Sequence, residues 1–306
     1  VENFIFKAFY SCAKDGVCQM VMASHVDDLI WAGQPEVLDK VDKLKSCLTL
    51  GTEESGKFRF RGREIEQNLE TFEIKITCRS TAEKLEDVFK PTTLSGRALA
   101  DVATVDEKER IRSSVGSLAW IGRACRPGIS YRVSYLQSHA ATAVLMDLKT
   151  TQETVKITRD GSEDGIVFHP GVDWDSAVFG YITDASFSEE DEFNPNTQKL
   201  EPYRSQGGTM IILATPNLRG KGTDIRFHVL SYSSTKIKRV CRSTMQAETY
   251  QLQLSVEHGD IVRACFADLN GVLDHKAWEA SAAAYKHSVW LTDCNSCSSA
   301  LARPVQ

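Results

Sequence analysis

The sequence predicts an α/β fold of the mixed α+β kind, and three observations lead to this prediction. Two strand-like runs near the start surround Asp15-Gly16, a dipeptide that favours a tight hairpin turn. Helix-like periodicity then fills the middle of the chain. From about residue 176 the pattern becomes three strands, a long helix, a strand and a last helix, which indicates a mixed sheet with helices packed on it.

In the first half of the chain the sequence predicts mostly short strands and helices. The expected strands there are 3–12, 17–24, 57–61 and 71–77. The expected helices are 35–48, 81–89 and two that follow the apolar repeats 111–121 and 129–140. Arg126-Pro127-Gly128 breaks the chain between the last two helices. The stretch 157–175 carries Gly, Asp and Pro, and we interpret it as a linker.

The second half carries longer elements. Its expected strands are 177–185, 206–214 and 228–234, followed by a helix at 243–268. Ser243 and Gln246 have capping-box spacing at the start of this helix. Its apolar stripe is expected to face the core: Ala247, Tyr250, Leu254, Ile261, Cys265 and Leu269. A last strand ends at Asp293, and Asn295 is expected to cap a final helix.

Length and composition narrow the possible classes of protein. A chain of 306 residues can bury a large core, and the typical size of a domain predicts two domains in it. The net charge of -5 argues against a uniformly basic protein that coats DNA. No run of about 18 apolar residues occurs, so we expect no membrane span. Nine cysteines, mostly without paired spacing, indicate an intracellular protein with free thiols.

Three acidic residues stand at the ends of three expected elements. Asp184 and Asp293 each end a strand-like run, and Glu248 lies in the first turns of the long helix. One such acid alone is better explained as a solvated element end. All three in this order suit a two-metal nuclease, because carboxylate oxygens are hard ligands for Mg²⁺ and two ions clamp both reacting oxygens of a phosphodiester.

Four stretches around these acids form a specific pattern together, although each alone is weak. They are Tyr181–Phe187 (YITDASF), Leu230–Lys236 (LSYSSTK), Arg242–Tyr250 (RSTMQAETY) and Trp290–Ser296 (WLTDCNS). In this order and spacing they resemble the ribonuclease H domain of copia-type (LTR) retrotransposon Pol polyproteins. Upstream, His25-Val26-Asp27-Asp28 is similar to the Tyr-Val-Asp-Asp motif of the same polyprotein's reverse transcriptase, and 115–120 with 126–129 resemble the segment that joins the two enzymes.

The resemblance covers nearly the whole chain and implies how it is divided. Residues 1–95 would be the C-terminal part of a reverse transcriptase, with a palm hairpin and a thumb-like region. Residues 96–170 would be a helical connection and linker. Residues 171–306 would be a ribonuclease H-like domain with a mixed sheet and flanking helices, truncated at its C-terminus. The chain would then be a fragment of a copia-type polyprotein.

The resemblance also implies roles for the acids. Asp184 would bridge two Mg²⁺ ions (or Mn²⁺), Glu248 would hold one of them, and Asp293 would complete that site. The family's fourth acid lies beyond residue 306, so we expect this chain to bind metal and to cleave slowly or not at all. Asp27 and Asp28 would bind Mg²⁺ in a polymerase, but the third polymerase acid belongs to an upstream strand. We therefore expect no polymerase activity from this chain alone.

Four cations precede the long helix: Lys236, Lys238, Arg239 and Arg242. Such a cluster is often a solvated face, but here it can contact nucleic-acid phosphates beside the acids. The expected reaction is hydrolysis of RNA in an RNA–DNA hybrid. One alternative is a non-catalytic relic that binds nucleic acid, which His25 and Gly128 favour because they depart from the family's residues. The other is a polymerase subunit completed by a separate chain.

The resemblance finally implies partners and a compartment. The expected partners are an RNA–DNA hybrid or another nucleic acid and the remainder of the Pol polyprotein, with no membrane involved. The expected location is intracellular, either in a cytoplasmic virus-like particle or in the nucleus.

Overall fold

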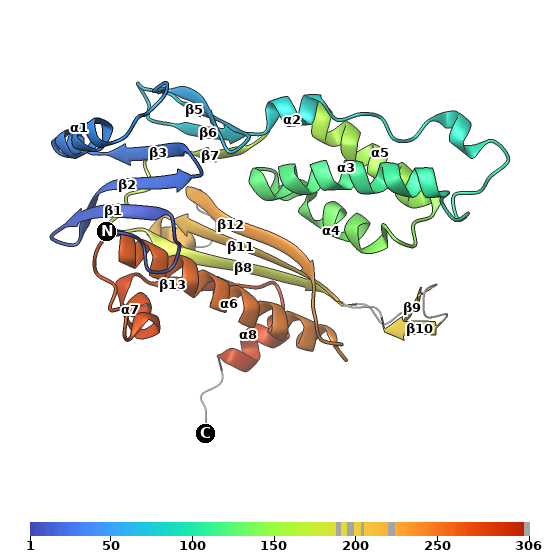
Figure 1. Cartoon of the computed structure of the whole chain (residues 1–306). Coiled ribbons are helices and arrows are strands. Elements are labelled where there is room, and N and C mark those ends of the chain that lie inside the picture. Colours follow the sequence, from blue (N-terminus) through green and yellow to red (C-terminus); the bar gives the residue numbers. More distant parts are fainter. Residues whose placement is uncertain (188–190, 195–198, 203–204, 220–223, 303–306) are drawn as a thin grey trace.

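The computed structural model of the chain is a mixed α+β structure, as the sequence predicts (Figure 1). It describes residues 1–187, 191–194, 199–202, 205–219 and 224–302. The described strands form one three-stranded sheet, one two-stranded sheet and two four-stranded sheets. No helix among the described residues has the length and apolar character that crossing a membrane requires.

The first sheet consists of β1 (Phe9–Lys14), β2 (Val17–His25) and β3 (Asp28–Gly33), all antiparallel. Asp15 and Gly16 both have positive φ, at 52° and 77°, as a two-residue hairpin turn requires. The strand expected at 3–12 begins only at Phe9, because the Asn3 carboxamide accepts from the N–H groups of Ile5 and Phe6 and turns the chain there. Helix α1 (Leu38–Cys47) follows this sheet.

The second sheet has the order β4-β5-β6-β7, with strands Lys57–Phe60, Arg63–Gln67, Ile74–Thr77 and Ile166–Phe168. Its last strand overturns the interpretation of 157–175 as a linker, because β7 pairs with β6 and returns the chain to the first part of the molecule. A run of three residues is too short for periodicity to reveal it.

Helices fill the middle of the chain: α2 (Arg79–Glu83), α3 (Val105–Ala124), α4 (Ser130–His139) and α5 (Leu145–Asp160). The helix expected at 81–89 ends early, since the N–H groups of Val88 and Phe89 donate to Gln152 Oε1 instead. The sequence pattern does not predict helix α5, because the threonines in it have low helix propensity. In the structure Thr151, Thr154 and Thr158 are buried, and their hydroxyls donate to carbonyls one turn back.

The third sheet is the one that positions the acids. Its order is β12-β11-β8-β13, with strands Phe227–Lys236, Gln206–Ala214, Val178–Ser186 and Ser288–Leu291. The first three strands are antiparallel and β13 runs parallel to β8, so the mixed sheet expected from the sequence is confirmed. In the sequence, β8 is followed by strands β9 (Asp191–Asn194) and β10 (Lys199–Pro202), which form the separate two-stranded sheet, and then by β11.

Helix α6 (Thr244–Leu269) packs along the third sheet, and α7 (Trp278–Tyr285) and α8 (Asn295–Leu301) follow (Figure 1). The expected core face of α6 is wrong in part: Leu254 is 48% exposed and Ile261 38% exposed. The helix instead buries polar side chains such as Gln251 and Ser255 against the sheet. Asn295 is the first residue of α8 rather than its cap, a position that Cys294 occupies.

Four 3-10 helices complete the described elements: Pro35–Val37, Pro91–Leu94, Pro127–Ile129 and Pro216–Arg219. Each begins with proline, whose fixed φ and missing N–H suit the first position of a helical turn.

Side-chain contacts tie the expected divisions of the chain together. Asn3 Nδ2 donates to Cys265 O at 3.3 Å, and the N–H of Cys18 donates to Asn270 Oδ1 at 3.0 Å, so the first sheet is attached to the end of α6. Gln206 Nε2 donates to Ser134 Oγ at 3.0 Å, which connects β11 to α4. The sheet that carries the acids is therefore supported from both earlier parts of the chain.

The start of α3 gives a test of how this helix is anchored. Thr104 and Glu107 form a capping box, and the buried Glu107 carboxylate also accepts from Arg97 at 2.8 Å and 3.2 Å. Burial raises the pKa of Glu107, but Arg97 and Thr104 lower it by more, so that the net shift is below the ordinary 4.5. The stabilisation is therefore present above pH 4.5 and lost as the pH falls through the lower folded value.

We expect Glu107→Gln to lower the free energy of unfolding by about 2 kcal/mol at neutral pH, because a charged hydrogen-bond partner is lost. The difference from wild type should shrink as the pH falls below 4.5 and through the lowered folded pKa of Glu107, because the carboxyl then becomes protonated in both states. Urea unfolding at neutral pH and at an acidic pH measures it, with the exposed Glu109→Gln as control. An equal difference at both pH values would contradict this account.

Candidate metal centre

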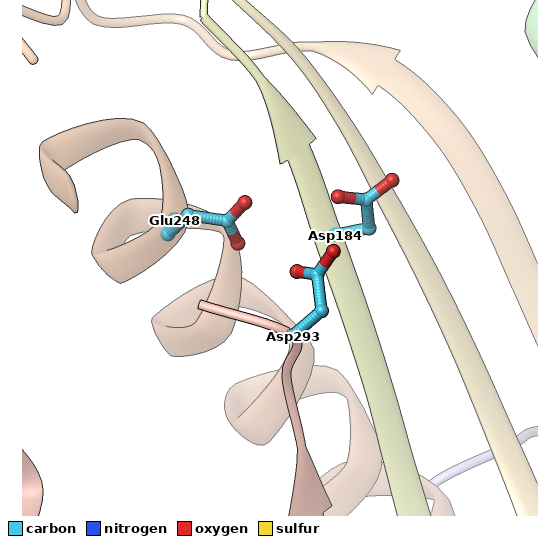
Figure 2. A group of neighbouring side chains, drawn as sticks. All are labelled: Asp184, Glu248 and Asp293. Carbon is cyan, nitrogen blue, oxygen red and sulfur yellow. The ribbon is translucent and has the colours of Figure 1, made fainter. Parts of the chain in front are cut away.

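The three acids predicted from the sequence meet at one end of the third sheet (Figure 2). Asp184 lies near the end of β8, and Glu248 is the fifth residue of α6. Strand β13 pairs in parallel with β8, with Leu291 opposite Ile182. Asp184 and Asp293 each lie two residues beyond this pair, Asp293 just after the end of β13, so the two aspartates come level with each other. The parallel register and the packing of α6 bring the carboxylates together.

The carboxylate oxygens lie close enough to share ions. One oxygen from each of Asp184, Glu248 and Asp293 lies within 4.8 Å of the others. Asp184 and Asp293 are exposed, whereas Glu248 is buried at 4% exposure. This is the convergence that the sequence predicted. The role of the three residues as metal ligands stays a prediction.

The Glu248 carboxylate is buried and only partly hydrogen-bonded, and its pKa is raised. Its Oε1 accepts from the N–H of Ala185 at 3.2 Å, while its Oε2 is buried without a hydrogen-bond partner in the described part of the chain. Burial is the main cause that raises the pKa of Glu248, and the negative charges of Asp184 and Asp293 raise it further. Within the described ranges, no lysine, arginine or histidine forms an ion pair with any of the three acids.

This donor set fits a divalent cation. Three carboxylates supply hard oxygen ligands, and an unpaired buried oxygen is a group that a cation would satisfy. A bound cation would also offset the mutual repulsion of three like charges held together.

Asp27 and Asp28 occupy a different part of the molecule. The turn between β2 and β3 is Val26-Asp27, Val26 has a φ of 57°, and both aspartates are exposed. The expected hairpin tip is confirmed. The tip belongs to the first sheet rather than the third, and neither residue joins a group of three potential ligands among the described residues.

The basic residues lie between β12 and α6. Lys236 ends β12, and the exposed Lys238, Arg239 and Arg242 follow before the helix starts. The Arg239 guanidinium lies over the Tyr250 ring at 5.3 Å from its centroid, and its hydrogen bond lowers the pKa of the Tyr250 phenol. These cations stand at the end of α6 that carries Glu248.

Sequence reasoning missed the polar residues of α6 that pack against the third sheet one and two turns after Glu248. Gln251 and Ser255 follow Glu248 at helical spacing and are buried against Thr209 of β11. The signal was present, because positions 248, 251, 255 and 259 recur on one face of a helix. A core face defined by apolar residues alone does not include these positions.

Comparison with known proteins adds no family to this picture. No protein-family model matches the chain, and no curated protein matches its sequence.

Charge neutralisation gives a test of the centre that does not depend on activity. We expect Glu248→Gln to raise the free energy of unfolding of the metal-free protein, because it removes a buried charge that two neighbours repel. Free Mn²⁺ at about 100 times its Kd should stabilise the wild type by about 2.7 kcal/mol and the variant by much less.

Thermal unfolding with and without Mn²⁺ measures both effects. Glu257→Gln, an exposed change on the same helix, is the control and should respond to Mn²⁺ as the wild type does. An equal Mn²⁺ response in Glu248→Gln would show that the ions bind elsewhere.

Proposed function

We propose that this chain is a ribonuclease H-type nuclease that hydrolyses the RNA strand of RNA–DNA hybrids with Mg²⁺ or Mn²⁺. We propose further that it is part of a copia-type retrotransposon Pol polyprotein. One observation carries the proposal: an Asp on β8, a Glu on α6 and an Asp two residues after β13 converge within 4.8 Å at the end of a β12-β11-β8-β13 sheet. The resemblance of the flanking residues supports the substrate class.

The arrangement of the acids suits hydrolysis of a phosphodiester. Divalent cations bound by Asp184, Glu248 and Asp293 would stabilise charge on the phosphate and activate water as the nucleophile. Asp184 and Asp293 are exposed, so they can contact a substrate backbone. Glu248 is buried next to them. Water as the nucleophile explains why the centre needs no Ser or Cys.

Recognition of the hybrid would rest on its backbone and its shape. Lys238, Arg239 and Arg242 lie exposed beside the end of α6 that carries Glu248, where they can contact phosphates. The 2′-hydroxyls of the RNA strand would distinguish the scissile strand from DNA. The other expected partner is the remainder of the polyprotein, inside a cytoplasmic virus-like particle or the nucleus.

A second candidate function follows from the tip of the β2–β3 hairpin. Asp27 and Asp28 are paired carboxylates at an exposed turn, a placement that suits Mg²⁺ binding in a polymerase. No third acid joins them among the described residues, so a polymerase site would need a carboxylate from elsewhere in the polyprotein.

Cleavage of a labelled RNA–DNA hybrid tests the main proposal. We expect at most slow RNA-strand cleavage that requires Mg²⁺ or Mn²⁺, and we expect Asp184→Asn to reduce it to background, because Asp184 is one of the three converging acids. Asp28→Asn is the matched control and should cleave as the wild type does. Hybrid binding without metal-dependent cleavage would favour the non-catalytic nucleic-acid-binding alternative, and absence of both would refute the proposal.

The basic residues are tested through salt dependence. We expect Lys238→Ala and Arg242→Ala each to weaken hybrid binding and to reduce the slope of log K against log salt by about 1, because each removes one phosphate contact. Fluorescence anisotropy at several salt concentrations measures the slope. Lys43→Ala, an exposed lysine on α1, is the control. Unchanged slopes would place the hybrid on another surface.

A further inference from the structure

A group of buried polar side chains lies between α6 and the third sheet, directly beside the acids. We call Thr183, Thr209, Gln251 and Ser255 the buried polar cluster. All four are almost fully buried, with exposed fractions of 3%, 7%, 3% and 0%. Helices usually pack on sheets through apolar side chains, so a polar contact at this depth requires an explanation.

Hydrogen bonds within the cluster connect the helix to the sheet. Gln251 Nε2 donates to Thr209 Oγ1 at 2.6 Å, and the hydroxyls of Thr209 and Ser255 lie 2.6 Å apart. Ser255 Oγ also donates to the backbone carbonyl oxygen of Gln251 at 2.9 Å. Hydrogen bonds are directional and are stronger in a buried environment, so these contacts favour one register of α6 on β11 over its neighbours.

The cluster is adjacent to two of the three acids along the chain. Gln251 follows Glu248 by one helical turn, and Thr183 immediately precedes Asp184 on β8. Thr183 is also the strand partner of Thr209. A shift of α6 along β11 would therefore move Glu248 relative to Asp184 by a similar amount.

Gly207 makes this close approach possible. It pairs with Ala185, whose N–H donates to Glu248 Oε1. A methyl group at position 207 would overlap the Gln251 side-chain amide, so the glutamine occupies the space that a larger residue would fill. The neighbouring Gly208 differs, because a methyl group there would meet only the Asp184 carbonyl oxygen, at 3.8 Å.

We propose that the buried polar cluster, seated on Gly207, is a positioning device that sets Glu248 against Asp184 and so determines the affinity of the centre for divalent cations. The inference rests on the proposed function, since it assigns a role towards the cation that this function requires. The cluster residues are positioning residues, because they act through Glu248 and Asp184.

Packing alone does not account for the cluster. Gln251 Oε1 and Thr183 Oγ1 are buried without a hydrogen-bond partner in the described part of the chain. Apolar side chains of similar size would fill the same space without leaving such atoms unpaired. The polar side chains therefore cost stability but fix the register of α6 on β11. The carboxylate centre is the part of the molecule next to this contact.

The test compares Mn²⁺ affinity, measured by electron paramagnetic resonance, among variants of the complete 306-residue chain. Gly207→Ala should displace Gln251 and weaken Mn²⁺ binding by about 10-fold or more, the usual effect of losing a residue that orients metal ligands. Gly208→Ala is the matched control on the same strand and should bind as the wild type does. Asp184→Asn, which removes a ligand, establishes that the measured Mn²⁺ occupies the centre.

A double variant separates loss of the cluster's hydrogen bonds from the steric overlap. Gly207→Ala combined with Gln251→Ala removes the overlap but also the hydrogen bond from Gln251 to Thr209, so it should still bind Mn²⁺ about 10-fold more weakly than the wild type. If Gly207→Ala does not fold by circular dichroism, Thr209→Val replaces it, because valine keeps the shape and removes the hydroxyl that accepts from Gln251. This variant should also weaken Mn²⁺ binding about 10-fold.

The outcomes distinguish the two proposals. Asp184-dependent Mn²⁺ binding that is unchanged in Gly207→Ala, or in Thr209→Val where that variant is needed, overturns the positioning role and leaves the proposed function intact. Mn²⁺ affinity in the double variant equal to that of the wild type also overturns it, because the hydrogen bond from Gln251 to Thr209 would then not be needed. Wild-type chain without Asp184-dependent Mn²⁺ binding overturns the proposed function and the positioning role together.

Discussion

The carboxylate centre depends on keeping three like charges within 4.8 Å of one another. Their repulsion opposes folding, and burial of Glu248 adds a desolvation cost to it. The opposing force comes from the backbone. Strand β8 is paired on both sides, antiparallel with β11 and parallel with β13, so the strand ends next to Asp184 and Asp293 stay together unless a strand pairing breaks. Helix α6 brings the third charge, because its buried face has no other partner as extensive as the sheet.

This arrangement places the centre at the junction of rigid elements instead of on loops. Asp184 lies within a strand and Glu248 within a helix, while Asp293 follows its strand by two residues. Side chains carried by paired strands and packed helices hold their geometry better than side chains on loops. The first sheet contributes indirectly, since Asn3 and Cys18 attach it to the end of α6 that lies away from the acids.

Much of the third sheet and of the centre could be predicted from the sequence, and the reasons are physical. Strands 178–186 and 206–214 are long and apolar, and the helix that begins after Ser243 has a recognisable cap. The earlier elements were harder. Helix α5 is stabilised by tertiary burial of its threonines. Strand β7 has three residues and is defined by its pairing with β6. Local patterns do not contain such long-range contacts, which also explains why the polar face of α6 was missed.

The pairing of β7 with β6 has a consequence for synthesis of the protein on the ribosome. Ile76 must wait for its strand partner Ile166, so the second sheet has an open edge throughout synthesis of α3, α4 and α5. Asn3 waits still longer for Cys265, 262 residues away. Such distant contacts slow folding and leave unpaired strand edges exposed to other chains in the meantime. The nascent protein therefore exposes the unpaired edge of β6 to aggregation until β7 has emerged from the ribosome.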